Sequence, residues 1–225
     1  MRYRRLGGSE VLVSEIGFGA WGIGGSPREA AAYGHTDDRV SLATLSRAVE
    51  LGVTFYDTAD LYGAGHSEEL LGAAFSRCRR QVILASKGGF LRGGGPQDFS
   101  PAHLTRALEG SLRRLRTDYV DVYQLHSPPA EVLAPESAAV QRLLQHKRAG
   151  KVRLLGASVR SPQDGLTAVR CGVFEVIQVN FNMIDQRALD NGLLAQCEAQ
   201  GVGIIVRTPL CFGFLSGKYA PEHPF

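Results

Sequence analysis

The segment GVTFYDTADLYG, residues 52–63, joins a short apolar run to an acid and a phenol that follow it closely. Apolar runs of this length, alternating with helical segments, are typical of buried parallel strands. The run at 53–56 therefore predicts a strand, with Asp57 at its carboxyl end and Tyr62 five residues further along the chain. This combination of a buried strand and polar residues at its end sets the expectation for the whole fold.

Two later segments repeat the pattern. The run VILAS at 82–86 precedes Lys87, and the run VDVYQL at 120–125 precedes His126. In a parallel α/β barrel, the polar residues at the carboxyl ends of the strands converge on one mouth. An acid, a phenol, an amine and an imidazole at one mouth form a set of groups suited to proton transfer.

Strand and helix patterns alternate along the rest of the chain. Residues 2–6 and 11–15 flank a glycine-containing turn and predict a β-hairpin. Strands are predicted at 16–19, 53–57, 81–86, 119–125, 152–157, 174–180 and 203–207, and helices at 38–51, 67–78, 101–116, 136–149, 162–171 and 187–200. This alternation predicts βαβ units, a parallel sheet and an α/β fold of the (β/α)8 TIM-barrel type. No linker interrupts the chain, so one domain is expected over residues 1–225.

The expected barrel is incomplete at its C-terminal end. A complete (β/α)8 barrel takes roughly 250 residues, and this chain of 225 residues has seven predicted strands and six predicted helices after the hairpin. An open barrel leaves unpaired strand edges. Three explanations stay open: the chain is a fragment, it is a natural short form that closes by pairing with another copy as a homo-oligomer, or it keeps the fold and has lost tight cofactor binding.

An open, doubly wound sheet is the competing architecture. Residues 17–22, GFGAWG, match the pattern GxGxxG of dinucleotide-binding folds. In those folds the glycines open a helix at once, whereas here a loop of small and polar residues at 22–36 is predicted, with Trp21 crowding the turn. The barrel is therefore preferred.

Composition narrows the class of protein. Charged residues make up 21% and the formal net charge is +3, so no nucleic-acid surface is expected. No apolar run is long enough to span a membrane, and no signal peptide is recognisable. The four cysteines show no ligand spacing, so free thiols, a cytoplasmic location and no bound metal are expected.

The proposed proton-transfer set has a clear chemical logic. A free phenol, with a pKa near ~10, is a poor proton donor at neutral pH, and a nearby ammonium favours the phenolate. A carboxylate would hold that ammonium in place, and an imidazole would orient the reacting oxygen. Only four of the 25 basic residues are lysines, so an ammonium at position 87 stands out in a chain that favours arginine. Each of the four residues alone also fits a structural role, and the prediction depends on their occurring together.

At these residues the chain resembles the aldo-keto reductase family. The segments that carry the resemblance are GVTFYDTA with LYG (52–63), HSEELLG (66–72), ILASK (83–87), LEGSLRRLRTDY (108–119) and DVYQLH (121–126). The similarity extends from the first residues to about Tyr219. The family consists of (β/α)8 barrels that reduce aldehydes or ketones with a nicotinamide cofactor.

The resemblance implies a role for each site residue. Tyr62 is the general acid, Lys87 and Asp57 tune it, and His126 orients the carbonyl. Trp21, Tyr62 and His126 line the substrate pocket, with a plain core tryptophan as the alternative for Trp21. The implied cofactor is NADPH, with NAD possible, and its implied contacts are Gly19, Ala20, Trp21, Asp57, Ser158, Gln178, Arg207, Pro209, Leu210, Gly213, Leu215, Gly217 and Lys218.

Two departures from the family pattern leave other functions open. The family has Ser-Asn after its fifth strand, and this chain has Ser158-Val159. The segment that grips the adenosine 2′-phosphate is absent from this chain. The leading prediction is an NAD(P)H-dependent reductase of a small carbonyl compound. The alternatives are a redox-inactive relative that catalyses a dehydration, cyclisation or isomerisation, and a non-catalytic cofactor-binding accessory subunit.

Overall fold

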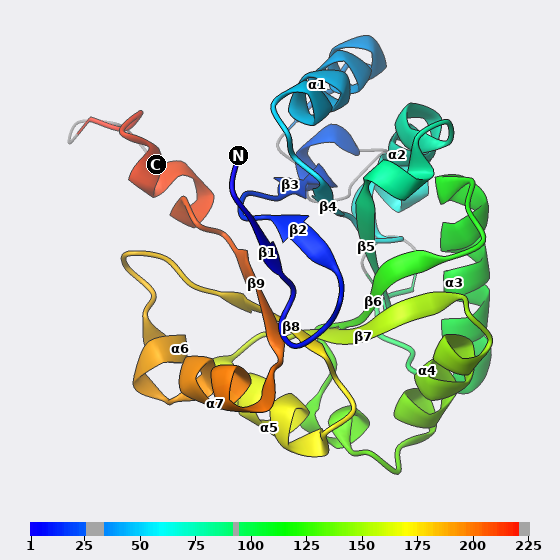
Figure 1. Ribbon diagram of the computed structural model, residues 1–225, viewed down its shortest axis with the longest axis vertical. Helices are drawn as coiled ribbons and strands as arrows, with labels where there is room; N and C mark the ends of the chain where they lie inside the picture. Colours follow the sequence, from blue (N-terminus) through cyan, green and yellow to red (C-terminus); the bar gives the residue numbers. More distant parts are fainter. Residues whose placement is uncertain (26–33, 92–94, 221–225) are drawn as a thin grey trace.

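A seven-stranded parallel sheet, curved into most of a barrel, forms the centre of the molecule (Figure 1). The computed structural model describes residues 1–25, 34–91 and 95–220. Neighbours in the sheet follow chain order from β3 to β9. The strands are β3 (Phe18–Gly19), β4 (Phe55–Asp57), β5 (Ile83–Gly88), β6 (Val120–His126), β7 (Val152–Ser158), β8 (Val176–Asn180) and β9 (Gly203–Arg207). The predicted barrel-type α/β fold is confirmed. Among the described residues the sheet ends at β3 and at β9.

The consecutive strand order rejects the doubly wound alternative. Such a sheet reverses its strand order at a switch point, and this sheet has none among its seven strands. The glycines at 17–22 lead into a single 3-10 turn, Ala20–Ile23, instead of a long helix. Residues 26–33 of the loop predicted at 22–36 lie outside the described residues.

Helices surround the curved sheet on its outer side (Figure 1). They are α1 (Asp38–Glu50), α2 (His66–Phe75), α3 (Pro101–Leu115), α4 (Ala138–Arg148), α5 (Pro162–Cys171), α6 (Arg187–Asp190) and α7 (Leu193–Gln200). The helix starts follow the sequence, since Asp37 and Ser100 cap α1 and α3 with their side chains. The single helix predicted at 187–200 is wrong. Gly192, with φ of +81°, divides it into α6 and α7, because that left-handed backbone cannot continue a helix.

The N-terminal hairpin closes the bottom of the barrel. Its strands β1 (Tyr3–Arg5) and β2 (Leu12–Ser14) pair antiparallel. Apolar side chains of the hairpin join inward-facing side chains of the barrel in one interior cluster of buried residues: Leu6, Val11, Val13, Phe55, Ala85, Val122, Leu154 and Val176. The larger core lies between the strands and the helices. The floor of the barrel is therefore filled with apolar side chains, whereas Asp57, Lys87 and His126 lie at the opposite, carboxyl ends of β4, β5 and β6.

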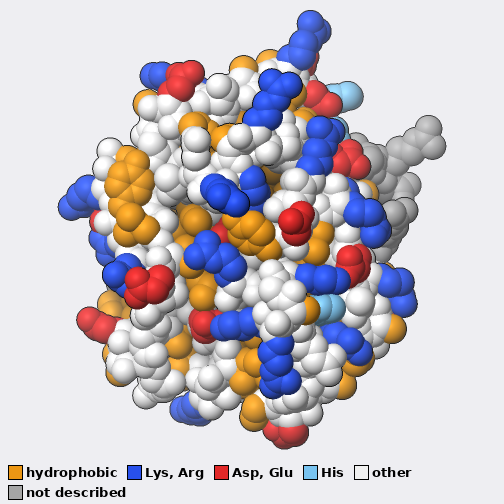
Figure 2. Space-filling model, turned by 45° about the vertical axis from the view of Figure 1, so that its right-hand side comes forward, with side chains coloured by type: hydrophobic (Ala, Val, Ile, Leu, Met, Phe, Trp, Pro, Cys, Tyr) orange, Lys and Arg blue, Asp and Glu red, His pale blue; other side chains and the backbone are white. Residues whose placement is uncertain are grey.

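The surface carries charges of both signs. On the face shown in Figure 2, Lys and Arg side chains are interspersed with Asp and Glu. No helix in the described part of the chain is both long and apolar enough to cross a membrane. All four cysteines are free thiols.

Candidate functional site

The ammonium of Lys87 lies at the centre of the polar groups at the barrel mouth. Its Nζ donates to Asp57 Oδ2 at 2.6 Å, to the Thr58 carbonyl oxygen at 2.8 Å and to the Tyr62 hydroxyl at 3.2 Å. The Lys87 side chain is fully buried at the end of β5. All three protons of the ammonium are therefore directed to oxygen atoms, and one of these oxygens is a phenol.

Burial and neighbouring charge shift the pKa of Lys87 in opposite directions. Burial acts to lower the pKa of the ammonium, but the charge of Asp57 and the contact with Tyr62 outweigh it, and the net pKa is raised. Lys87 is thus a permanent cation beside the Tyr62 hydroxyl.

Asp57 receives two further hydrogen bonds on its other carboxylate oxygen. Gln178 Nε2 donates to Oδ1 at 2.9 Å and Gln124 Nε2 donates to it at 3.1 Å. Ser158 Oγ in turn bonds Gln178 Oε1 at 3.1 Å. Sequence reasoning missed Gln124. The signal was its position two residues before His126 on the same strand, since alternate residues of a strand share a face.

His126 lies over the mouth beside two aromatic rings. Its imidazole meets the Tyr62 ring edge-on, with centroids 6.0 Å apart, and the Phe90 ring at 4.9 Å. Burial, with the charges of Lys87, Arg207 and Arg160, holds the pKa of His126 well below its usual range. The imidazole is therefore neutral at physiological pH, so it can orient a substrate oxygen by hydrogen bonding and is not an imidazolium acid.

A second buried polar cluster lies behind the mouth. Glu68 of α2 is fully buried and bonds both Ser86 Oγ at 2.5 Å and Arg114 at 2.7 Å. Burial and the charge of Glu68 raise the pKa of Asp60 to about 7. Asp60 Oδ1 and the Tyr123 hydroxyl have no hydrogen-bond partner among the described residues. Asp60 belongs to the loop between β4 and Tyr62, so the cluster is adjacent to that loop.

A cavity of about 1430 Å³ opens beside the mouth and along β9. The residues predicted to contact substrate, Tyr62, His126 and Trp21, line this cavity. Asn180, Phe90 and Thr208, which sequence reasoning missed, line it as well. The residues expected at the cofactor that line the cavity are Gly19, Trp21, Asp57, Gln178, Arg207, Pro209, Leu210, Gly213 and Lys218. Those that do not line it are Ala20, Ser158, Leu215 and Gly217.

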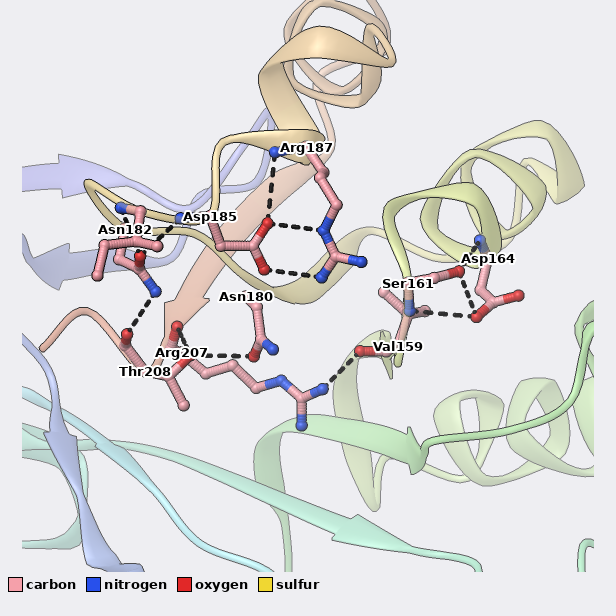
Figure 3. Close-up of polar contacts among 10 residues, drawn as sticks. Val159, Ser161, Asp164, Asn180, Asn182, Asp185, Arg187, Arg207 and Thr208 are labelled. Carbon is pink, nitrogen blue, oxygen red and sulfur yellow. Dashed lines mark hydrogen bonds and ion pairs between the residues drawn. The ribbon is translucent and has the colours of Figure 1, made fainter. Parts of the chain in front are cut away.

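Arg207 extends from the end of β9 across the top of the sheet (Figure 3). Its Nη2 donates to the Val159 carbonyl oxygen at 2.8 Å, while its Nε has no partner among the described residues. The Val159 side chain is fully buried, so it offers the mouth no polar group. Thr208 is held from two sides, because its hydroxyl bonds Asn180 at 3.1 Å and its carbonyl oxygen accepts from Asn182 at 3.1 Å.

The residues around the cavity fit a nicotinamide dinucleotide. The segment Cys211–Ser216 bends through left-handed backbone at Phe212 and Gly213, and the N–H groups of Cys211, Gly213 and Leu215 donate to the carbonyl oxygens of Thr208 and Leu210. Lys218 adds a cation to the same wall, and the buried Arg207 Nε is a donor without a partner in the described structure. The Lys218 ammonium and the Arg207 Nε donor suit an anionic ligand with a polar ring. The cavity is large enough for such a ligand.

Comparison with known proteins agrees with this geometry. A family model described as "Aldo/keto reductase family" matches residues 15–225. The chain is 35% identical to "Aldo-keto reductase YhdN" of Bacillus subtilis, covering 100% of this chain and 67% of that protein. It is 32% identical to "NADH-specific methylglyoxal reductase" of Escherichia coli, covering 97% of this chain and 70% of the relative. A solved aldo-keto reductase, AKR11C1 from Bacillus halodurans, matches with a TM-score of 0.86 and 32% identity, over 100% of this chain and 72% of that one.

Proposed function

Since this chain belongs to the aldo/keto reductase family, we propose that it reduces the carbonyl group of a small aldehyde or ketone to an alcohol. Tyr62 is the general acid in this proposal. The observation that carries it is the Lys87 ammonium, which bonds the Tyr62 hydroxyl at 3.2 Å and Asp57 at 2.6 Å. A buried cation held by a carboxylate stabilises a phenolate, so the phenol can release its proton to a substrate oxygen.

The protein groups divide the proton chemistry between them. Tyr62 donates its proton to the carbonyl oxygen as negative charge develops there. Lys87 stabilises the resulting phenolate, and Asp57 keeps Lys87 in position. His126, neutral because of burial and neighbouring cations, bonds the same carbonyl oxygen and orients it toward Tyr62.

A reduced nicotinamide cofactor, when bound, supplies the hydride for this reduction. Gln178, with Ser158 behind it, would hold the carboxamide of the nicotinamide. Arg207 would lie against the ring, and residues 209–218 with Lys218 would face the phosphates. One relative is named as specific for NADH, so NADH belongs beside NADPH as a candidate donor.

A cofactor titration tests the proposal. NADPH and NADH are added separately to the purified chain, and cofactor fluorescence is followed to saturation. A panel of aldehydes, with methylglyoxal included because of the relative's name, is then offered and oxidation of the cofactor is recorded. Saturable binding with aldehyde-dependent oxidation is expected.

Other outcomes point to the alternatives. A folded chain that binds neither cofactor at millimolar concentration would contradict the proposal and favour a redox-inactive acid–base enzyme. Saturable cofactor binding without oxidation by any carbonyl in the panel would favour an accessory subunit. Circular dichroism on the same sample establishes that the chain is folded.

A further inference from the structure

Gln124 is a buried amide at the centre of the barrel for which no role has been assigned above. It lies on β6 directly between Lys87 of β5 and Gly156 of β7 in the sheet register. Its side chain is fully buried and does not line the cavity. Gln124 is therefore set back from the cavity, and the one described hydrogen bond of its amide goes to Asp57 Oδ1.

The neighbouring strand leaves room for this side chain. A Cβ atom at Gly156 would lie 2.9 Å from Cγ of Gln124, closer than real Cβ atoms come to other atoms. Glycine at 156 thus allows the Gln124 side chain to cross the barrel interior toward Asp57, 67 positions earlier in the chain. The glycine at 156 on β7 and the glutamine at 124 on β6 are thus both required for the Gln124–Asp57 hydrogen bond.

A contribution to stability alone does not explain why position 124 carries an amide side chain. Gln124 Oε1 is buried and has no partner in the described part of the chain. A buried acceptor without a partner destabilises a fold, and an apolar side chain of similar shape would avoid that cost. The amide is therefore better explained by the group to which it donates.

We infer that Gln124 is a positioning residue for proton donation, and that it acts through Asp57. This inference rests on the proposed function. Gln124 and Gln178 both donate to Oδ1, which keeps the carboxylate oriented so that Oδ2 faces Lys87. Lys87 is thereby held against the Tyr62 hydroxyl. Gln178 lines the cavity and Gln124 does not, so only Gln124 is expected to act on proton donation without affecting cofactor binding.

The main test is Gln124→Met, which keeps the length of the side chain and removes the donor. We expect kcat to fall about tenfold, as for loss of one hydrogen bond to a charged group. The dissociation constant of NADPH should stay within about twofold of wild type, and the melting temperature should not fall, because the unpartnered acceptor is also removed. Gln141→Met, on the exposed side of α4, is the matched control.

A double-mutant cycle shows whether Gln124 acts through Asp57. In an Asp57→Asn background, Gln124→Met should cost less than about twofold further in kcat, since residues acting on one another are not additive. An equal tenfold loss in both backgrounds, or kcat unchanged in the single variant, would overturn the inference. A lower melting temperature with unchanged kcat would assign Gln124 a purely structural role.

A measurement without turnover separates this inference from the proposed function. The chain has four lysines, and only Lys87 has its ammonium fully buried among oxygen atoms. In protein labelled with 15N at lysine Nζ, the Lys87 ammonium protons should exchange with water several-fold faster in Gln124→Met. Unchanged exchange contradicts the inference even if the wild-type chain reduces no carbonyl. An inactive wild type with faster exchange contradicts the proposed function alone.

Discussion

In the proposed mechanism, proton donation depends on the Tyr62 hydroxyl, which has aromatic and charged neighbours. The Tyr62 ring contacts the rings of Trp21 and His126, with centroids 6.5 Å and 6.0 Å away. The Lys87 ammonium lies 4.8 Å from the centre of the same ring. These neighbours leave the phenol little freedom, so its hydroxyl is held at the cavity wall where a substrate oxygen would approach.

Removing that hydroxyl should abolish turnover and leave binding intact. For Tyr62→Phe we expect kcat to fall by roughly 10²–10⁴-fold, the usual contribution of a general acid. Tyr56→Phe on β4 is the control, because the Tyr56 hydroxyl bonds the Val53 carbonyl oxygen and Tyr56 does not line the cavity. Single-turnover kinetics and cofactor titration measure the two effects. Retained turnover in Tyr62→Phe would remove Tyr62 from the mechanism.

Asp60 makes the free energy of unfolding depend on pH, because its pKa differs between the folded and the unfolded chain. Its folded-state pKa is about 7, above the value of about 3.9 in an unfolded chain. The folded protein therefore binds more protons between these values, and its stability falls as the pH rises from about 4 to 7. The groups that face Asp60 are Glu68, Arg114, Lys87 and Tyr123.

Asp60→Asn should remove this dependence. We expect the variant to be more stable than wild type at pH 8 by on the order of 2–4 kcal/mol, with the difference shrinking toward pH 4. Urea unfolding at several pH values measures it. A difference that is constant with pH would mean that the Asp60 carboxyl is not the group that titrates.

At the scale of elements, α2 and α3 approach each other at a glycine. A Cβ at Gly72 of α2 would lie 2.2 Å from the Arg114 carbonyl oxygen at the end of α3. Helix propensity alone favours alanine at such a position by up to about 1 kcal/mol. The contact with rigid backbone outweighs that preference, so packing and not propensity explains the glycine.

Gly72→Ala should therefore destabilise the protein by about 2–4 kcal/mol. Gly110→Ala in α3 is the matched control, because the nearest neighbours of its Cβ would be the end of the Arg114 side chain, at 3.0 Å, and no backbone atom. The control should change stability by less than about 1 kcal/mol. Chemical denaturation of both variants makes the comparison, and equal effects would refute the packing argument.

The starts of α1 and α3 were predictable from the sequence, but the break between α6 and α7 was not. Asp37 and Ser100 cap their helices through bonds to nearby backbone N–H groups, an interaction within a few residues. The division between α6 and α7 was missed because a glycine inside a helical pattern is often tolerated. Asn191-Gly192 was the available signal, since both residues favour turn conformations.

For the whole molecule, the hairpin that closes the barrel depends on close backbone contact with β9. Gly8 N–H donates to the Gly201 carbonyl oxygen at 2.7 Å. Gly7 has φ of +60°, and a Cβ there would lie 2.4 Å from backbone atoms of both Gly201 and Gly203. The floor and the cavity wall therefore meet at this contact.

Gly7→Ala should loosen the floor and destabilise the molecule by about 2–4 kcal/mol, since both the backbone conformation and the space are unsuitable for alanine. Gly8→Ala is the control, because its Cβ would lie at an ordinary 3.4 Å from its nearest neighbour, the Gly201 carbonyl oxygen. Thermal unfolding of the two variants measures the difference. A stable Gly7→Ala variant would show that the hairpin adjusts its docking.

The sequence by itself determined the strand–helix alternation, the barrel class and the four polar residues at strand ends, because these depend on local periodicity and on the common direction of parallel strands. Only the tertiary structure decided which side chains donate hydrogen bonds to the Asp57 carboxylate, and that Arg207 donates to the Val159 carbonyl oxygen. Gln124 and Gln178 reach Asp57 from 67 and 121 residues away. Such contacts depend on the curvature of the sheet and the register of its strands, which no local pattern of residues encodes.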